Sequence, residues 1–235
     1  MDLGLKGRKA IVCASSQGLG LACATALARE GALVTINGRT ADKLVAAAAE
    51  IKAKTGADVK ICVADINTEA GRATLLASTP EPDILINNNA GPNPGKIEDW
   101  DYAMWLAAVE ANMLAPIMLI KAVVPGMKER RFGRIVNITS AMVKSPSPTM
   151  GLSTAVRAGL TALSKSVQHS TVPFNVTINN MLPERFDTAR QQFMAERMVK
   201  NEGITLEEAR KKIADTISAK RMGDPEEFGD ACAFL

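Results

Sequence analysis

The sequence has few aromatic side chains and very few of the residues that most often act as catalytic acids and bases. Only 4% of the 235 residues are aromatic, and the chain contains one tyrosine, Tyr102, and one histidine, His169. Any mechanism that needs a catalytic tyrosine or histidine therefore has a single candidate of each kind.

Cysteines are also scarce and widely separated. Cys13, Cys23, Cys62 and Cys232 form no CxxC pair and have no spacing typical of metal ligands, which argues against a disulfide framework and against a metal centre. We expect them to be small buried side chains in a reducing cytoplasm.

The chain lacks both an excess of one charge and a long uninterrupted apolar run. Lys and Arg number 28 against 25 Asp and Glu, a net charge of +3, without the basic tract typical of nucleic-acid binding. The longest apolar stretch, Leu114–Val124, is interrupted by Pro116 and Lys121, and the N-terminus lacks the profile of a signal peptide. We therefore expect a cytoplasmic protein that binds neither nucleic acid nor a membrane.

Short runs rich in valine and isoleucine alternate with longer helical patterns over most of the chain. In a chain with 47% hydrophobic residues this order predicts one α/β domain, a doubly wound parallel sheet of the Rossmann type with helices on both faces. The predicted strands are Lys9–Ala14, Leu33–Asn37, Val59–Ala64, Asp83–Asn87, Gly133–Thr139 and Asn175–Met181. The predicted helices are Gly18–Glu30, Ala41–Lys54, Thr68–Ser78, Glu98–Arg130 and Ser153–Ser170.

The segment Thr188–Arg221 departs from this order, because it is helical in pattern, strongly charged and without a strand. Within it, Thr205 and Glu208 have the spacing of a capping box, and the later Asp224-Pro225 predicts the start of a further helix. The chain ends inside that helix, without the strand that the alternation predicts. We therefore expect a single domain over residues 1–235 whose C-terminus is truncated.

A glycine-containing turn follows the first predicted strand and leads directly into the first helix. Such a turn lets backbone N–H groups approach a pyrophosphate, and the helix N-terminus adds partial positive charge. An ordinary tight turn would explain the same glycines, but its place between the first strand and the first helix favours dinucleotide binding. The candidate residues are Ser15, Ser16, Gln17, Gly18, Leu19 and Gly20.

The end of the second predicted strand favours NADP(H) over NAD(H). An acidic residue at this place binds the ribose 2′-hydroxyl of NAD, whereas an arginine pairs with the 2′-phosphate of NADP. Here Asn37 and Arg39 lie at the strand end, and the nearest acid, Asp42, already belongs to the next helix. The alternative is that Arg39 is only a solvated surface charge.

Four further motifs follow in order along the chain: Asp65-Ile66, Asn87-Asn88-Asn89-Ala90-Gly91, Asn112, and Val136-Asn137-Ile138-Thr139-Ser140. Together with the glycine turn they resemble the short-chain dehydrogenase/reductase family, from about Leu5 to the end of the chain. The resemblance implies a homodimer or homotetramer and a helical substrate lid over residues 188–221. It also implies a cofactor site in which Asp65 and Ile66 flank the adenine, Asn89, Ala90 and Gly91 line the cofactor, and Pro183 and Thr188 lie beside the nicotinamide.

The catalytic group that this resemblance implies comprises Asn112, Ser140 and the tyrosine and lysine of a YxxxK motif. At the positions where the tyrosine and the lysine are expected, this chain has Ser153 and Arg157. Tyr102 lies in another predicted helix and cannot replace the phenol without rearrangement. A serine hydroxyl is a much weaker acid than a phenol, whereas Arg157 stays charged and can still hold ribose hydroxyls.

Two functional hypotheses remain open. The first is an NADP(H)-dependent oxidoreductase for a small carbonyl or alcohol, in which Asn112, Ser140, Ser153 and Arg157 form an altered catalytic group. The second is a catalytically impaired NADP(H)-binding protein that acts as a sensor or an assembly partner. Loss of a positioned acid or base typically lowers a rate by about 10²–10⁴, so cofactor binding is expected in both cases. The small basic excess of residues 189–221 fits an anionic substrate and fits a solvated helical face equally well.

Overall fold

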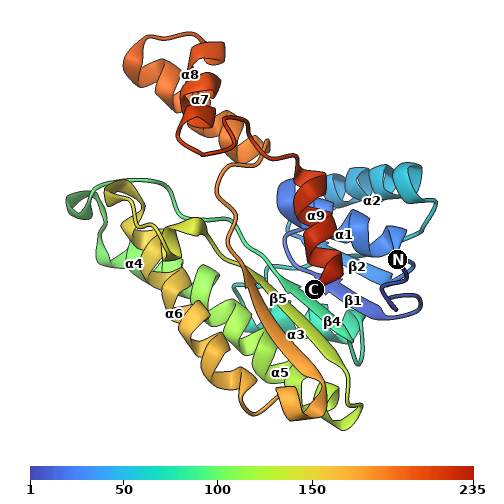
Figure 1. The fold of residues 1–235 in the computed structure, drawn as a ribbon. Helices are drawn as coiled ribbons and strands as arrows, with labels where there is room; N and C mark the ends of the chain where they lie inside the picture. The colour runs from blue at the N-terminus through green and yellow to red at the C-terminus, as the bar shows by residue number, and fades with distance from the viewer.

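A parallel sheet of six strands forms the centre of the protein in a computed structural model that describes all 235 residues (Figure 1). The strand order is β3-β2-β1-β4-β5-β6, and all neighbouring strands are parallel. The predicted doubly wound sheet is confirmed, and each predicted strand forms to within two residues at either end. The strands are β1 Lys9–Val12, β2 Leu33–Gly38, β3 Lys60–Val63, β4 Ile84–Asn87, β5 Gly133–Ile138 and β6 Val176–Met181.

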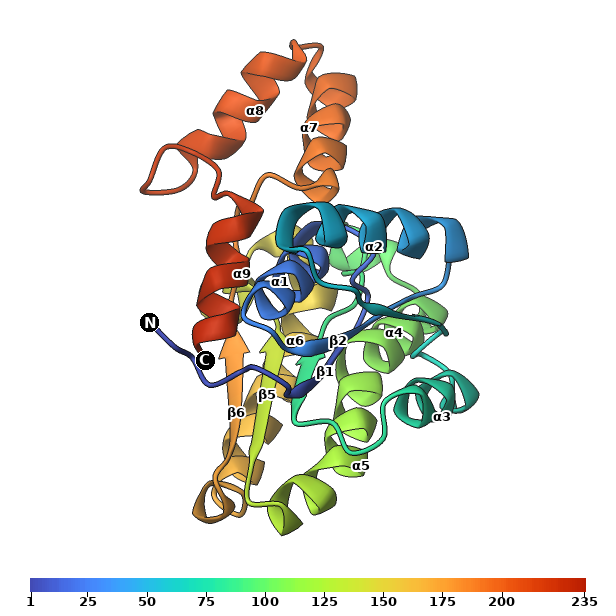
Figure 2. The same ribbon diagram turned by 90° about the vertical axis from the view of Figure 1, so that its right-hand side faces the viewer.

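Helices cover both faces of this sheet, with α1, α2 and α9 packed on one face and α3, α5 and α6 on the other (Figure 2). The helices are α1 Gly18–Arg29, α2 Ala41–Thr55, α3 Glu69–Ser78, α4 Tyr102–Val109, α5 Ala115–Glu129, α6 Gly151–Gln168, α7 Ala189–Glu202, α8 Leu206–Asp215 and α9 Pro225–Phe234. Short 3₁₀ turns lie at Ile97–Asp99, Ala141–Val143, Pro148–Met150 and Val172–Phe174.

Successive residues of each strand face opposite sides of the sheet, and this divides the core into two halves. In β1, Ala10 and Val12 belong to the half that contains α1, whereas Ile11 belongs to the half that contains α5. All four cysteines are buried and unpaired, as expected. Burial raises the pKa of Cys13 to about 12, because the thiolate is poorly solvated there.

The longest apolar helical segment, Tyr102–Glu129, is also a structural part of this core. Its 28 residues are long and apolar enough to cross a membrane by length and composition. In the fold the segment lies against the sheet, and Leu119, Val123 and Met127 are buried there. We conclude that this is a core helix of the α/β domain.

The helix in this segment begins later than predicted and is interrupted by a π turn. It starts at Tyr102 and not at Glu98, because the Asp101 carboxylate accepts a hydrogen bond from a backbone N–H of the first turn and caps the helix. Between α4 and α5 the backbone forms a π turn, Glu110–Leu114. Such turns often occur at functional sites, and this one contains the buried Asn112.

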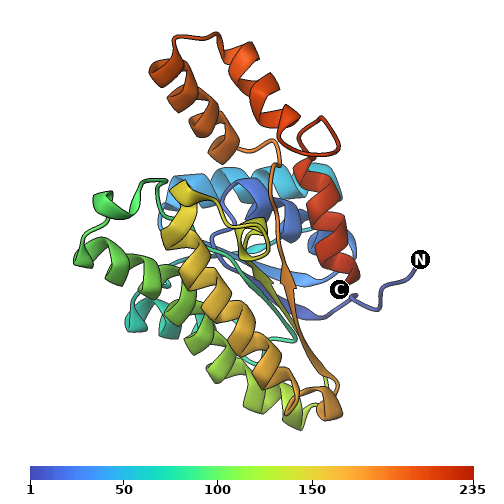
Figure 3. The same ribbon diagram turned by 60° about the vertical axis from the view of Figure 1, so that its left-hand side comes forward.

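Helices α7 and α8 form a hairpin that stands away from the sheet (Figure 3). Ala195, Ala209 and Ile213 make a small apolar cluster within this hairpin, separate from the main core. The predicted capping box of Thr205 and Glu208 forms at the start of α8. Because α7 begins close to the carboxyl edge of the sheet, its first residues reach the cavity described next.

Candidate active site

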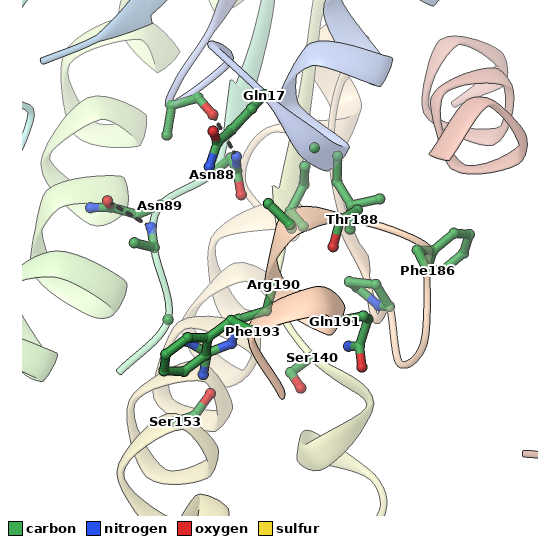
Figure 4. A pocket seen from close by; sticks show the side chains of 18 of the residues that line it. Gln17, Asn88, Asn89, Ser140, Ser153, Phe186, Thr188, Arg190, Gln191 and Phe193 are labelled. Atoms are coloured by element: carbon green, nitrogen blue, oxygen red, sulfur yellow. Dashed lines mark hydrogen bonds between the residues drawn. The ribbon is translucent and has the colours of Figure 1, made fainter. Parts of the chain in front are cut away.

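A cavity of about 740 Å³ lies at the carboxyl edge of the sheet (Figure 4). Its walls come from the ends of β1, β2, β4 and β5 and from the first turns of α1 and α7. Strands β1 and β4 are neighbours in the sheet, and the chain leaves them in opposite directions. In doubly wound folds the crevice that opens at this switch point is the usual ligand site.

Most of the residues singled out in the sequence meet in the wall of this one cavity. Ser15, Gly20 and Asn112 are the exceptions, and they lie behind the wall. Those that line the cavity are Ser16, Gln17, Gly18, Leu19, Asn37, Arg39, Asp65, Ile66, Asn89, Ala90, Gly91, Ser140, Ser153, Arg157, Pro183 and Thr188.

The turn between β1 and α1 offers an anion site made by the backbone. Gln17 precedes α1 and makes no side-chain cap, so no side chain occupies the N–H groups of the first turn. Gly18 has a positive φ of 59°, which favours glycine at this position. At Gly20 a Cβ atom would lie 2.5 Å from the Ala14 carbonyl oxygen, so only glycine allows the helix to pack this closely. These features fit the pyrophosphate of a dinucleotide.

Ser15 and Asn37 hold the strand ends together beneath this turn. The fully buried Ser15 hydroxyl donates to the Val12 carbonyl oxygen at 2.7 Å and accepts from the Asn37 backbone N–H at 3.0 Å. The Asn37 side chain in turn donates to carbonyl oxygens of Cys62 and Ala64, at 3.1 and 3.0 Å. Ser15 is therefore a support of the site and does not line the cavity.

Two cations lie unpaired at the end of β2. Arg39 is exposed, lines the cavity, and has no carboxylate within 4.0 Å. Lys43, in the first turn of α2, lines the same wall and is likewise unpaired, although nothing in the sequence indicated that it faces the cavity. Asp42 does not line the cavity. This donor set fits the 2′-phosphate of NADP better than an unphosphorylated ribose.

The loop after β4 is fixed by asparagine side chains. Asn88 donates to the Ala14 carbonyl oxygen at 3.0 Å and so joins this loop to the glycine turn. Asn89 donates to Asn67 at 2.8 Å and to the Ala111 carbonyl oxygen at 2.9 Å. These bonds hold the backbone of the loop in place along the cavity.

Asn112 is not on the cavity wall, although the family resemblance implies a catalytic role for it. It is 5% exposed, and its side chain donates to the Ala90 carbonyl oxygen at 3.3 Å. A small void behind the wall is lined by both Asn112 and Arg157. Asn112 therefore lies beneath the loop after β4, behind the residues that line the cavity.

Ser140 and Ser153 lie at the end of the cavity away from Gln17 (Figure 4), and Arg157 follows Ser153 by one turn of α6. Ser140 follows β5 and accepts a hydrogen bond from the Met142 backbone N–H at 3.2 Å. Ser153 is 4% exposed on α6, and its hydroxyl has no hydrogen-bond partner within the protein (Figure 4). Tyr102 is 77% exposed and does not line the cavity, so it supplies no phenol here.

The Arg157 guanidinium is oriented by the backbone of β5. One of its terminal nitrogens, Nη1, donates to the carbonyl oxygens of Ile138 and Thr139, at 2.7 and 2.8 Å. The residue is only 8% exposed, and burial followed by the nearby charge of Arg190 lowers its pKa to about 10. At neutral pH the group is still a cation.

The first turns of α7 contribute cavity residues that the sequence did not predict. Arg190, Phe193 and Met194 all line the wall, and Figure 4 shows the first two. Arg190 donates to the Pro92 carbonyl oxygen at 2.9 Å and has no carboxylate partner. The only sequence signal was the basic excess of residues 189–221, which did not indicate which cations face the cavity.

The switch-point crevice, the glycine turn and the unpaired cations together define a dinucleotide-binding α/β protein. Residues 8–198 match the family model described as short chain dehydrogenase, so the chain belongs to the short-chain dehydrogenase/reductase family of oxidoreductases. It is 31% identical over 240 residues to the uncharacterized oxidoreductase YvaG of Bacillus subtilis (strain 168), across 100% of this chain and 91% of YvaG. It is also 31% identical over 233 residues to the NADPH-dependent reductase BacG of the same organism, across 97% and 90% of the two chains.

Solved structures of reductases also superpose closely on this chain. The L-sorbose reductase of Gluconobacter frateurii, complexed with NADPH and L-sorbose, superposes with a TM-score of 0.94 at 28% identity, over 100% of this chain and 91% of that one. A 3-oxoacyl-(acyl-carrier-protein) reductase of Agrobacterium tumefaciens with NADP bound superposes with a TM-score of 0.89 at 26% identity, over 100% and 89%. These relatives support a nicotinamide dinucleotide as the ligand of the cavity.

Proposed function

We propose that this protein is an NADP(H)-dependent oxidoreductase that interconverts a small carbonyl compound and its alcohol with an altered catalytic group. One observation carries the proposal: a single cavity joins the glycine turn and Arg39 at one end to Ser140, Ser153 and Arg157 at the other. The NADPH-dependent relative BacG and the NADPH complex of the sorbose reductase support the choice of cofactor.

In this proposal Arg39 and Lys43 bind the 2′-phosphate, and residues 15–20 bind the pyrophosphate. Asp65 and Ile66 flank the adenine, residues 89–91 line the dinucleotide, and Pro183 and Thr188 lie beside the nicotinamide. When bound, NADPH supplies the hydride for a carbonyl carbon. Asn112 positions the loop that contains Ala90 through its hydrogen bond.

The hydroxyls of Ser140 and Ser153 orient the substrate oxygen in this proposal, and both line the cavity. Arg157 adds a fixed positive charge beside them, because the carbonyl oxygens of β5 hold its guanidinium. Neither serine is acidic enough to replace a phenol, so a water molecule in the cavity relays a proton from the solvent to the alkoxide and is itself regenerated. The positive charge stabilises that developing negative charge.

Removing one of these hydroxyls tests the proposed enzyme. We expect Ser140→Ala to lower kcat for the best substrate of a ketone and aldehyde panel about 10²-fold, as loss of one oxyanion donor does. Consumption of NADPH is followed by its absorbance, and Ser145→Ala is the matched control, because Ser145 is exposed and lies outside the cavity. Equal activity of the wild type and the Ser140→Ala variant would contradict the assigned role of Ser140.

The alternative is a catalytically impaired NADP(H)-binding protein that serves as a sensor or an assembly partner. The serine at position 153, where a phenol is expected, favours it. Binding of NADPH without its consumption by any carbonyl compound of the panel would select this alternative.

We also propose that the chain forms a homodimer or homotetramer in the cytoplasm, with residues 188–221 as the substrate lid of its single domain. Exposed apolar side chains of α4 and α5, including Met104, Leu106 and Met118, support self-association. The four buried free thiols are consistent with a reducing compartment.

A further inference from the structure

Two arginines meet at the serine end of the cavity without any acidic partner. Arg157 is buried and Arg190 is half-buried, and both line the cavity. Neither has a carboxylate within 4.0 Å, and their only hydrogen bonds go to backbone carbonyl oxygens of Ile138, Thr139 and Pro92. The Nε and Nη2 groups of Arg157 have no hydrogen-bond acceptor in the protein.

This arrangement has an electrostatic cost that an anion would remove. Burial, followed by the nearby charge of Arg190, lowers the pKa of Arg157, and burial, followed by the nearby charge of Arg197, lowers that of Arg190. The acids in the cavity wall, Asp65 and Glu184, form no ion pair with either arginine. A buried cation is normally paired, so the unpaired Arg157, with the half-buried Arg190 close enough to affect its pKa, indicates a partner from outside the chain.

The cofactor does not neutralise these two arginines, because the ribose hydroxyls that Arg157 can hold carry no charge and the phosphates fit other parts of the cavity. The sites that fit the phosphates are the glycine turn after β1 and the pair formed by Arg39, after β2, and Lys43, in the first turn of α2. Arg157 lies one turn after Ser153 on α6, and Arg190 lies on α7 at the same end of the cavity as Ser153 and Ser140 (Figure 4).

We propose that the substrate carries a carboxylate, held between the guanidinium groups of Arg190 and Arg157, so that the carbonyl compound is a keto acid and the alcohol a hydroxy acid. This inference rests on the proposed function, because it names the substrate class of the same site. A planar guanidinium offers two parallel N–H donors that match a carboxylate. Phe193 and Met194 provide an apolar surface for the rest of the substrate. Because Arg190 lies on α7, binding of the carboxylate also fixes the start of the α7–α8 hairpin against the sheet.

The test compares acids with their methyl esters, which keep the ketone but lose the charge. Pyruvate, acetoacetate and levulinate vary the distance between the two groups, and each is titrated against the NADP⁺-loaded protein by calorimetry beside its ester. We expect at least one acid to bind about 10- to 100-fold more tightly than its ester. Arg190→Gln is expected to reduce that difference about ten-fold, because only the Arg157 guanidinium then remains for the carboxylate.

Lys200→Gln is the matched control, since Lys200 is an exposed cation of the same helix outside the cavity. Equal binding of every acid and its ester overturns the carboxylate site, as does an acid preference that is undiminished in Arg190→Gln. Acids that compete with NADP⁺ also overturn it, because they would then occupy the phosphate sites. A protein that binds no NADP⁺ but still binds acids more tightly than their esters contradicts the proposed function, while it supports the anion site.

Discussion

Replacing Arg39 with aspartate is expected to weaken NADPH binding by about 10²- to 10³-fold and to strengthen NADH binding. The exposed guanidinium has no carboxylate partner in the protein, so it is free to pair with a 2′-phosphate. Loss of a charge-assisted pair costs about 1.5–3 kcal/mol, and a carboxylate at the same place adds repulsion of the phosphate. The same carboxylate accepts hydrogen bonds from the 2′-hydroxyl of NADH.

Both cofactors are titrated by calorimetry against the wild type, Arg39→Asp and the control Lys121→Asp. Lys121 is an exposed, unpaired cation on α5 outside the cavity, so its replacement changes the net charge equally. If the two variants lose NADPH affinity to the same extent, Arg39 is only a surface charge and the selectivity for NADP(H) has another origin.

Introducing a phenol and an amine together, as Ser153→Tyr with Arg157→Lys, is expected to raise the rate of reduction of simple ketones by about 10²–10⁴-fold. Ser153 lines the cavity, so a ring at this position projects into open space. A lysine one turn further along α6 lowers the pKa of the new phenol and makes it a usable proton donor. The measurement is kcat/KM for cyclohexanone and similar neutral ketones with NADPH.

Two checks make this result interpretable. Thermal unfolding and NADPH titration confirm that the double variant folds and binds cofactor, and Arg157→Lys alone, which adds no phenol, is expected to gain little. A folded, cofactor-binding double variant no faster than the wild type would show that positions 153 and 157 do not hold the acid–base pair. A gain on simple ketones with a loss on keto acids would agree with the carboxylate site.

The strands were predictable because this sheet is buried on both faces, so its strands read as short apolar runs bounded by turn residues. The start of α4 was not predictable, because Ile97, Trp100 and Met104 keep the helical spacing of apolar residues upstream of Asp101. Capping by the Asp101 side chain decides that boundary, and a local hydrogen bond of this kind leaves only a weak signal in the sequence.

The site was predictable where its residues are adjacent in the chain, as in the glycine turn and at the end of β2. Arg190 and Lys43 were missed because only the packed fold shows which cations of a charged helix face the cavity. The orientation of Arg157 also depends on tertiary structure, since the carbonyl oxygens of β5 that hold it belong to another element. Asn112 was expected at the catalytic end of the cavity, but it belongs to the π turn between α4 and α5 and lies behind the cavity wall.

The most direct test of the account is a calorimetric titration of the unmodified protein with NADPH and, in parallel, with NADH. We predict one site per chain with a dissociation constant for NADPH in the micromolar range, as for typical cofactor sites, and binding of NADH at least about ten-fold weaker. The absence of binding heat with either nucleotide at millimolar concentration, measured at two temperatures, would contradict the assignment of the cavity to a nicotinamide dinucleotide.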